Sequence, residues 1–333
     1  MGHWSRRQFV QGVGVAGLGL VAGCGRWPGQ VATPPRVWRI GLLTPVSAPW
    51  AYIADFLGGL QDFGYVEGQN LAIEYRYADN QRERLGALAA ELVGLPVDVI
   101  VTHTTAATEA AHRATAALPI VFMAISDPVG QGFVASLARP GTNATGTSDF
   151  GVALSGKRLE FLRGLVSGTA PVAVLRDVGN PSSDLEWAAT EDAARGLGVE
   201  LHPVEVRRAN DLPGAFDTAR GSQCDALLVL TSPLVNQNLP LIVSQAVTNR
   251  LPVMYFQRAQ AVGGGLIAYG PRYSDLYRRT GYYVDRIIRG ATPADLPVEQ
   301  PTTFDFVINL KTAQALGLTI PQHVLLQATE VIQ

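Results

Sequence analysis

Short apolar runs alternate with segments of helical period along the chain from Val37 onward. The run Ile120–Ile125 is apolar at every position, which indicates a strand with both faces buried. Strands that alternate with helices predict a parallel sheet covered by helices, so the expected fold class is α/β. This first stretch predicts strands at Val37–Leu43, Leu71–Tyr77, Val97–Thr102 and Ile120–Ile125, with helices at Tyr52–Phe63, Arg82–Leu95 and Thr105–Ala117.

The pattern starts again after residue 150, without repeating the first sequence. A chain of 333 residues suggests about two domains, which agrees with two α/β units. The second stretch predicts strands at Val172–Arg176, Val199–Val206, Ala226–Leu230 and Val253–Phe256, with helices near Ser155–Leu165, Ser183–Gly196, Leu212–Arg220 and Asn236–Arg250. The tail adds a strand at Leu266–Tyr269, a helix at Ser274–Arg289, a strand at Phe304–Asn309 and a short helix from Leu310.

Three breaks rich in proline or glycine interrupt this order, at Pro140–Asn143, Gly263–Gly265 and Pro293–Pro301. We expect the chain to cross between the two units near these breaks, so that three strands join two lobes and act as a hinge. The predicted boundaries are residues 37–148 with 264–292 for lobe 1, and residues 149–263 with 293–333 for lobe 2. A ligand cleft is expected between the lobes.

The first 36 residues read as an export signal and a tether. Ser5–Val10 matches the twin-arginine motif, and the apolar stretch Val10–Ala22 is too short for a permanent membrane helix. Val21–Cys24 resembles a lipobox, which predicts a signal peptide over residues 1–23 and acylation of Cys24; the alternative is a stray thiol. Residues 24–36 are then a Pro- and Gly-rich tether. The protein is expected on the periplasmic or cell-surface side, anchored to the membrane by lipid.

Motifs for catalysis or cofactors are incomplete. Gly12–Gly17 has the dinucleotide spacing but lies inside the export signal, and no acid occurs before Asp55. Gly151–Arg158 lacks the Ser or Thr that a P-loop needs after its lysine, so a helix start with Ser155 as N-cap is the preferred interpretation. The net charge of −2 leaves no excess positive charge that would bind nucleic acid. No two of the five histidines have the sequence spacing of metal ligands, so no metal site is predicted. We therefore expect no enzyme activity, no cofactor and no metal.

Open α/β sheets bind ligands at the carboxyl ends of their strands. In this sequence the loops that follow the strands are rich in hydroxyl and amide side chains. Free amides at the helix N-termini suit an anionic group, and Asp127 either accepts an ammonium group or caps a helix that begins at Pro128. His103 also ends a strand, as a structural residue or as one that faces the cleft. The aromatic residues near these ends belong to the core or stack on a flat ligand; they are Trp50, Phe256 and Tyr269.

Several segments from Arg39 to Ile332 resemble one family, the substrate-binding lipoproteins of ABC transporters, whose best-known members are similar to receptors for tryptophan or other aromatic amino acids. The segments that carry the resemblance are Gly64–Asn70, Leu88–Leu92, Val97–Val101, Asp127–Gly130, Leu137–Asn143, Leu154–Glu160, Ile308–Ala313 and Leu316–Leu318. Two positions depart from the family pattern. The loop Asp177–Pro181 keeps only the second of two expected Asn-Pro pairs, and Thr102-His103 replaces small residues.

The resemblance implies a type I periplasmic-binding-protein fold, with two Rossmann-like lobes that close on a small molecule and deliver it to an ABC permease. We also expect a monomer, and the net charge predicts no nucleic-acid partner. The alternatives are a ligand-sensing receptor for a signalling partner and, less favoured, a Rossmann-type enzyme. The residues predicted to bind the ligand are Ser47, Thr104, Thr105 and Asp127 from lobe 1, and Asn180, Thr231, Ser232, Asn236 and Phe256 from lobe 2.

Overall fold

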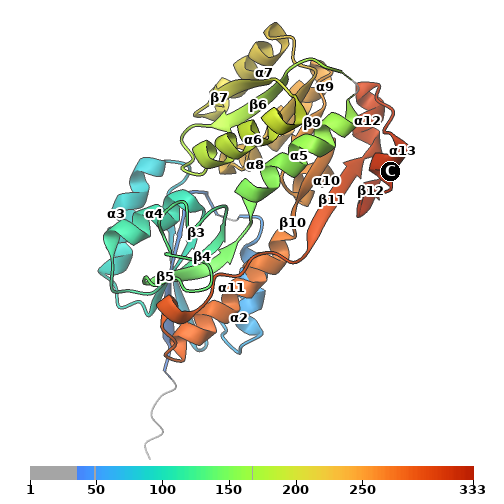
Figure 1. Cartoon of the computed structure of the whole chain (residues 1–333). Helices are drawn as coiled ribbons and strands as arrows, with labels where there is room; N and C mark the ends of the chain where they lie inside the picture. Colours follow the sequence, from blue (N-terminus) through green and yellow to red (C-terminus); the bar gives the residue numbers. More distant parts are fainter. Residues whose placement is uncertain (1–35, 49, 167) are drawn as a thin grey trace, which may run out of the picture. The chain divides into compact units, whose positions relative to one another are not determined.

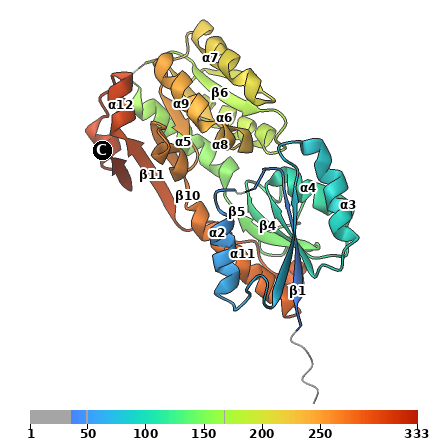
Figure 2. The same cartoon turned by 180° about the vertical axis from the view of Figure 1, so that it is seen from behind.

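The computed structural model describes residues 36–48, 50–166 and 168–333. The predicted signal, Cys24 and residues 24–35 of the tether lie outside the described residues. Residues from Val37 to Gln333 form one compact unit that contains two sheets (Figures 1 and 2). No described helix is long and apolar enough to cross a membrane. The prediction of two α/β lobes with mostly parallel sheets is confirmed.

Lobe 1 is built on a parallel sheet of strand order β2-β1-β3-β4-β5. Its strands are β1 (Trp38–Thr44), β2 (Leu71–Tyr77), β3 (Val99–His103), β4 (Ile120–Ile125) and β5 (Ala144–Ser148). Its helices are α2 (Ile53–Gln61), η1 (Arg82–Arg84), α3 (Leu85–Val93), α4 (Thr105–Ala114), α11 (Tyr273–Ile288) and η3 (Pro293–Asp295). Alternate side chains of the strands pack on α2 and α11 on one face and on α3 and α4 on the other.

Lobe 2 is built on a sheet of order β12-β11-β10-β9-β8-β6-β7, in which only the β10–β11 pair is antiparallel. Its strands are β6 (Val172–Asp177), β7 (Leu201–Val206), β8 (Ala226–Val229), β9 (Val253–Tyr255), β10 (Ile267–Pro271), β11 (Phe304–Asn309) and β12 (Glu330–Ile332). Its helices are α5 (Gly151–Leu165), α6 (Ser183–Leu197), η2 (Ala209–Asp211), α7 (Leu212–Gly221), α8 (Pro233–Gln237), α9 (Leu239–Thr248), α10 (Arg258–Val262), α12 (Leu310–Leu316) and α13 (Gln322–Leu325).

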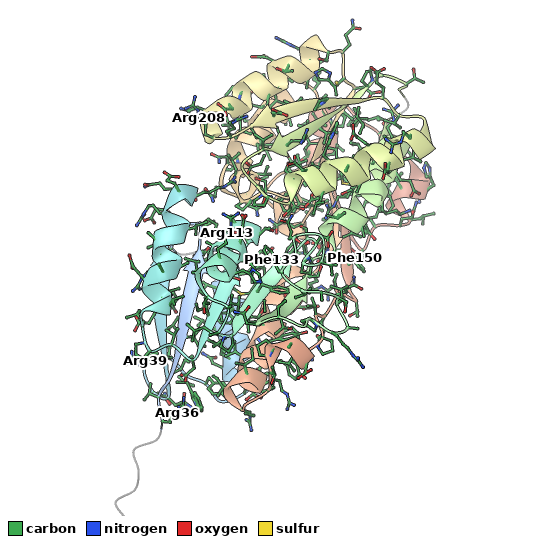
Figure 3. All side chains as sticks on the ribbon, turned by 60° about the vertical axis from the view of Figure 1, so that its left-hand side comes forward. Arg36, Arg39, Arg113, Phe133, Phe150 and Arg208 are labelled. Atoms are coloured by element: carbon green, nitrogen blue, oxygen red, sulfur yellow. The ribbon has the colours of Figure 1, made fainter. Side chains whose placement is uncertain are left out.

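The chain passes between the lobes three times: from β5 to α5, from β10 to α11, and between Glu299 and β11. The predicted boundaries change at two points. β10 pairs with β9 and β11, so it belongs to lobe 2 and only the α11 part of residues 264–292 belongs to lobe 1. The stretch up to Glu299 pairs with Thr147 of β5 and therefore stays with lobe 1. Figure 3 labels Phe150 at the first passage.

Helix α11 is held in lobe 1 by two glycines. A Cβ on Gly59 would lie 2.0 Å from the carbonyl oxygen of Arg278, and a Cβ on Gly281 would lie 2.2 Å from the carbonyl carbon of Gly59. The backbones of α2 and α11 therefore touch, which any larger residue at either position would prevent. This contact places the first turns of α11 beside the carboxyl ends of the lobe 1 strands, as Figure 2 shows.

Two helix predictions were wrong in detail. Helix α5 begins at Gly151 and not after Ser155, because the side chain of Asp149 accepts a hydrogen bond from the amide of Gly151 at 2.9 Å. Ser155 lies inside the helix, where its hydroxyl donates to the carbonyl of Gly151. The single helix predicted at Asn236–Arg250 is divided into α8 and α9, since Pro240 can enter only the first turn of a new helix.

Candidate functional site

A cavity of about 920 Å³ lies between the lobes, at the carboxyl ends of their parallel strands. Of the nine residues predicted from the sequence to bind ligand, all except Asp127 line it. Those lining it are Ser47, Thr104, Thr105, Asn180, Thr231, Ser232, Asn236 and Phe256. Their contact with a ligand stays a prediction, but the structure brings them to one place from loops that are far apart in the sequence.

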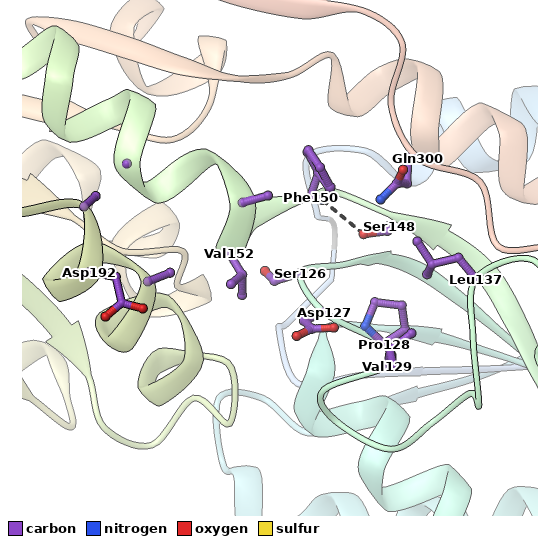
Figure 4. Close-up of a pocket in the computed structure, with 14 residues that line it drawn as sticks. Ser126, Asp127, Pro128, Val129, Leu137, Ser148, Phe150, Val152, Asp192 and Gln300 are labelled. Carbon is purple, nitrogen blue, oxygen red and sulfur yellow. Dashed lines mark hydrogen bonds between the residues drawn. The ribbon is translucent and has the colours of Figure 1, made fainter. Parts of the chain in front are cut away.

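Asp127 lies outside this cavity. Its Oδ1 accepts a hydrogen bond from the amide of Gly130 at 2.8 Å, within a turn and not at the start of a helix. It lines a separate pocket of about 590 Å³ with Val129, Val152 and Asp192, shown in Figure 4. Asp127 therefore does not lie with the other eight predicted residues, although the preceding residue, Ser126, lines both pockets.

Lobe 1 contributes a wall of stacked rings. Trp50 stacks on His103 with ring centroids 4.4 Å apart and an angle of 13°, and it meets Tyr277 edge-on at 5.4 Å. Tyr52 stacks on the other side of Tyr277 at 4.9 Å and 6°. Because each ring is held by another, the wall is rigid and presents flat apolar surface.

His103 has both of the roles considered from the sequence. Its Nδ1 lies 2.9 Å from the hydroxyl of Thr44, and its ring also lines the cavity. Burial lowers the pKa of His103 to about 3, so the imidazole is neutral at physiological pH. Burial, with a smaller contribution from Asp55, raises the pKa of Tyr52 to about 12. The aromatic wall therefore carries no charge.

Three buried polar atoms on the cavity wall have no hydrogen-bond partner within the described residues: Trp50 Nε1, Thr104 Oγ1 and Thr231 Oγ1. Buried polar groups are almost always paired, so these three atoms are candidates for hydrogen bonds to a ligand or to water. Thr104 also has a φ of 79° at the start of α4, a strained conformation for a β-branched residue. These features concentrate where a bound polar molecule would satisfy them.

Lobe 2 contributes amides that are already bonded to one another. Asn236 Oδ1 accepts hydrogen bonds from Gln257 and, at 2.9 Å, from Gln260. Gln260 Oε1 in turn accepts from the backbone amides of Phe256 and Gln257, each at 3.1 Å. Asn236 and Gln257 line the cavity as parts of this network, which fixes the loops after β8 and β9.

The remaining predicted residues of lobe 2 also form hydrogen bonds within the lobe. Asn180 Nδ2 donates to the carbonyl of Thr231 at 2.7 Å. Ser232 donates to Asp177 at 2.7 Å and accepts from the amide of Leu234, so it caps α8. These bonds hold the Thr231 loop in place, while the hydroxyl of Thr231 has no partner among the described residues.

Asp149 is the one fully buried carboxylate among the described residues that line the cavity. It follows β5, where the chain passes into lobe 2, and it accepts hydrogen bonds from Gly151 N at 2.9 Å and Tyr273 OH at 3.0 Å. Burial raises its pKa, while the Gly151 amide and Arg158 act in the opposite direction. A buried carboxylate beside a cavity is a site for a cationic group.

Sequence reasoning missed this residue and the tyrosines of α11. Asp149 follows a strand that was treated only as a crossing, although the strand-end rule applies to it as well. Tyr273 and Tyr277 are four residues apart on one helix face, and nothing in their spacing distinguishes a cavity wall from a core. Of the three aromatic residues considered from the sequence, Trp50 and Phe256 line the cavity, and Tyr269 packs against Phe161 and Phe306 in the core of lobe 2.

Direct bonds join the lobes around the cavity. Four of them are Thr105 Oγ1 with Ser182 Oγ at 2.7 Å, Arg82 with Asp177 at 2.5 Å, Tyr52 OH with Gln257 Oε1 at 3.2 Å and Gln131 Nε2 with the Pro181 carbonyl at 3.0 Å. All four join groups that are more than 45 positions apart in the sequence. The described structure is thus one in which the lobes meet at the rim of the cavity.

The chain is similar to solute receptors of known structure. It is 27% identical over 315 residues to a tyrosine-binding protein of Clostridioides difficile, covering 92% of this chain and 90% of the relative. A conserved domain protein from Vibrio cholerae aligns with a TM-score of 0.84 and 27% identity over 89% of this chain and 100% of the other. An ABC domain from Streptococcus pneumonia solved in complex with L-Trp aligns with a TM-score of 0.81 and 29% identity, over 89% and 100%.

A ligand-free, open structure of a substrate binding protein with adhesive properties from Clostridium difficile aligns with a lower TM-score of 0.64, at 27% identity over 89% and 99% of the two chains. The family model described as ABC transporter substrate binding protein matches residues 39–332. That match includes both lobes and every residue that lines the cavity. The chain therefore belongs to the ABC transporter substrate binding protein family, whose members are solute receptors and not enzymes.

Proposed function

We propose that this protein is an exported lipoprotein that captures an aromatic amino acid in the cavity between its lobes and delivers it to an ABC import permease. The observation that carries the proposal is a neutral wall of stacked rings that faces unpaired hydroxyls beside one buried carboxylate. Two relatives support the ligand class, since one is named a tyrosine-binding protein and the other was solved with L-Trp.

The wall supplies a place for each part of such a ligand. The rings of Trp50, Tyr52 and Tyr277 offer flat surface for an aromatic side chain. Asp149 offers a carboxylate to the ammonium group. The hydroxyls of Thr104, at the N-terminus of α4, and of Thr231 offer donors to the carboxylate. Asp149 thus takes the role that the sequence suggested for Asp127.

Isothermal titration of the purified protein with L-tryptophan, L-tyrosine and L-phenylalanine tests the ligand class. We expect binding of at least one of them, and much weaker binding of L-leucine, tryptamine and indole-3-propionate, which lack the ring, the carboxylate and the amine respectively. A ligand at a hundred times its Kd stabilises the fold by about 2.7 kcal/mol, so thermal unfolding is an independent readout. Absence of heat and of a thermal shift with all three amino acids would exclude this ligand class.

Anchoring at Cys24 is a separate part of the proposal and rests on the sequence of the first 24 residues. Two or three acyl chains hold a protein on a membrane nearly permanently. We expect the wild-type protein in the membrane fraction of its host and the Cys24→Ser variant in the soluble extracytoplasmic fraction. Cys224→Ser is the matched control and should fractionate as wild type. Equal distribution of wild type and Cys24→Ser would contradict lipidation.

A further inference from the structure

A group of ionisable side chains is buried where the lobes join, and of its members only Asp149 lines the cavity. Glu186 of α6 is 0% exposed and Arg158 of α5 is 1% exposed, and Asp149 lies next to both. A Cβ on Gly151 would lie 2.7 Å from Ser126 Oγ, 3.0 Å from Asp149 Oδ1 and 3.1 Å from Glu186 Oε1. Three oxygens, two of them from carboxyl groups, therefore converge above one glycine.

Glu186 connects three parts of the molecule. Its Oε1 is in hydrogen-bonding contact, at 3.0 Å, with the hydroxyl oxygen of Ser126, which belongs to lobe 1. Its Oε2 accepts at 2.8 Å from the backbone amide of Thr231, in the lobe 2 loop that lines the cavity. The carboxyl group of Glu186 thus binds lobe 1 to lobe 2 and positions a residue of the ligand site.

The charges in this group do not balance while both carboxyl groups are ionised. The guanidinium of Arg158 in α5 lowers the pKa of Glu186 by its charge, and the carboxylate of Asp149, just before α5, raises it. Tyr273 of α11 reaches the group through Asp149, while the loops of Ser126 and Thr231 supply neutral donors. One guanidinium cannot neutralise two buried carboxylates, so a single proton held between them removes the excess charge.

Burial supports this arrangement. It raises the pKa of Glu186 to about 7, with Asp149 acting in the same direction and Arg158 against it. A carboxyl group exposed to water has a pKa of about 4.3. The proton therefore binds while the lobes enclose Glu186 and dissociates when water reaches it.

We propose that Glu186 is a proton-dependent latch between the lobes: neutral when the lobes are together, it donates its hydroxyl hydrogen to Ser126, and it ionises when lobe 1 moves away. The hydroxyl of Ser126 accepts this bond and turns its own hydrogen to Asp149. The inference rests on the proposed function only in that the lobes close on a ligand. An open, ligand-free relative shows that such lobes separate in one family member.

The sign of the pH dependence follows from the raised pKa. The protonated form favours contact between the lobes, so the latch is strongest in mild acid and is lost as the pH rises through about 7. Ligand affinity should fall by at most about tenfold per pH unit between about pH 5 and pH 7, and should level off above that range. Protonation of Asp149 would have the opposite effect, because it removes the partner of the ligand's ammonium group.

Titration calorimetry with L-tryptophan across this pH range tests the latch. Glu186→Gln keeps an acceptor for the Thr231 amide and a donor for Ser126, so it imitates the neutral form. We expect the affinity of Glu186→Gln relative to wild type to rise by about tenfold or more between pH 5.5 and pH 8, because only the wild-type carboxyl group can ionise over this range. Glu160→Gln, at an exposed glutamate of α5, is the control and should keep the wild-type profile. A uniform weakening by Glu186→Gln at every pH would overturn the proposal and leave a structural contact.

A second measurement needs no ligand. Small-angle scattering of the ligand-free protein should show a larger radius of gyration near pH 8 than near pH 6, and the change should disappear in Glu186→Gln. The same radius at both values in wild type would overturn the latch. If the scattering changes as expected while no aromatic amino acid binds, the ligand class fails and the latch stands.

Discussion

The two walls of the cavity are built by different means. Lobe 1 presents rings that stack on one another, with Tyr52, Tyr277, Trp50 and His103 in a continuous series. Lobe 2 presents amides that bond to each other and to the backbone through Gln260 and its neighbours. Rings discriminate between side chains by shape, and fixed polar loops hold groups that every amino acid shares. We therefore expect the rings of lobe 1 to select the ligand's side chain. The groups that all amino acids share are held by Asp149 and by one hydroxyl from each lobe, those of Thr104 and Thr231.

The largest effect is expected at Asp149, the charged group between the two walls. Asp149→Asn should weaken binding of L-tryptophan by about 100-fold, because truncating one side of a buried charge pair costs about 2–5 kcal/mol. Calorimetry with indole-3-propionate is the matched measurement, since that compound has no ammonium group. An equal loss for both compounds would mean that Asp149 holds the passage from β5 to α5 and does not bind the amine.

A smaller effect, limited to selectivity, is expected from the ring wall. Trp50→Leu should weaken binding of L-tryptophan by about tenfold, since ring contacts contribute about 0.5–1.5 kcal/mol beyond the area they bury. The preference for aromatic over aliphatic amino acids should fall by the same factor. Phe63→Leu changes a partly exposed ring elsewhere in lobe 1 and should leave affinity unchanged. An undiminished preference in Trp50→Leu would remove the role assigned to lobe 1.

The smallest effect is expected from a single hydroxyl of lobe 2. Thr231→Val should weaken all amino-acid ligands by about fivefold, because a typical hydrogen bond contributes about 1 kcal/mol. The loss should be the same for L-tryptophan and L-tyrosine, unlike that of Trp50→Leu. Thr218→Val, on the exposed face of α7, is the control. If the loss of affinity in Thr231→Val depended on the side chain of the ligand, Thr231 would not bind a group that all amino acids share.

The sequence predicts the fold well because buried parallel strands leave a continuous apolar signal. Ile120–Ile125 and Leu71–Tyr77 have in the structure the bounds that their residues predicted. Thr104 and Thr231 line one cavity, as predicted from the rule that the carboxyl ends of parallel strands meet at one edge of a sheet. That rule locates loops and not individual side chains, so it also selected Asp127, which lines a separate pocket.

Other parts of the site could not be predicted, because they depend on packing between distant elements. Tyr273 and Tyr277 reach the cavity only because Gly59 and Gly281 allow α11 to lie against α2. Glu186 is a helix residue with nothing in its neighbours to separate it from a solvated glutamate. Its burial follows from Arg158, Asp149 and Ser126, which come from three other segments.

The three passages between the lobes have a consequence for how the chain folds. Lobe 1 needs α11, which the chain reaches only after it has built most of lobe 2, and lobe 2 needs β11 and β12, which come last of all. Neither lobe is a contiguous module, so no cut between them yields an independent half. During synthesis the unfinished lobe 1 sheet lacks the cover of α11, and such incomplete intermediates expose apolar surface. The receptor therefore matures as a whole, and its C-terminal segment decides when folding is complete.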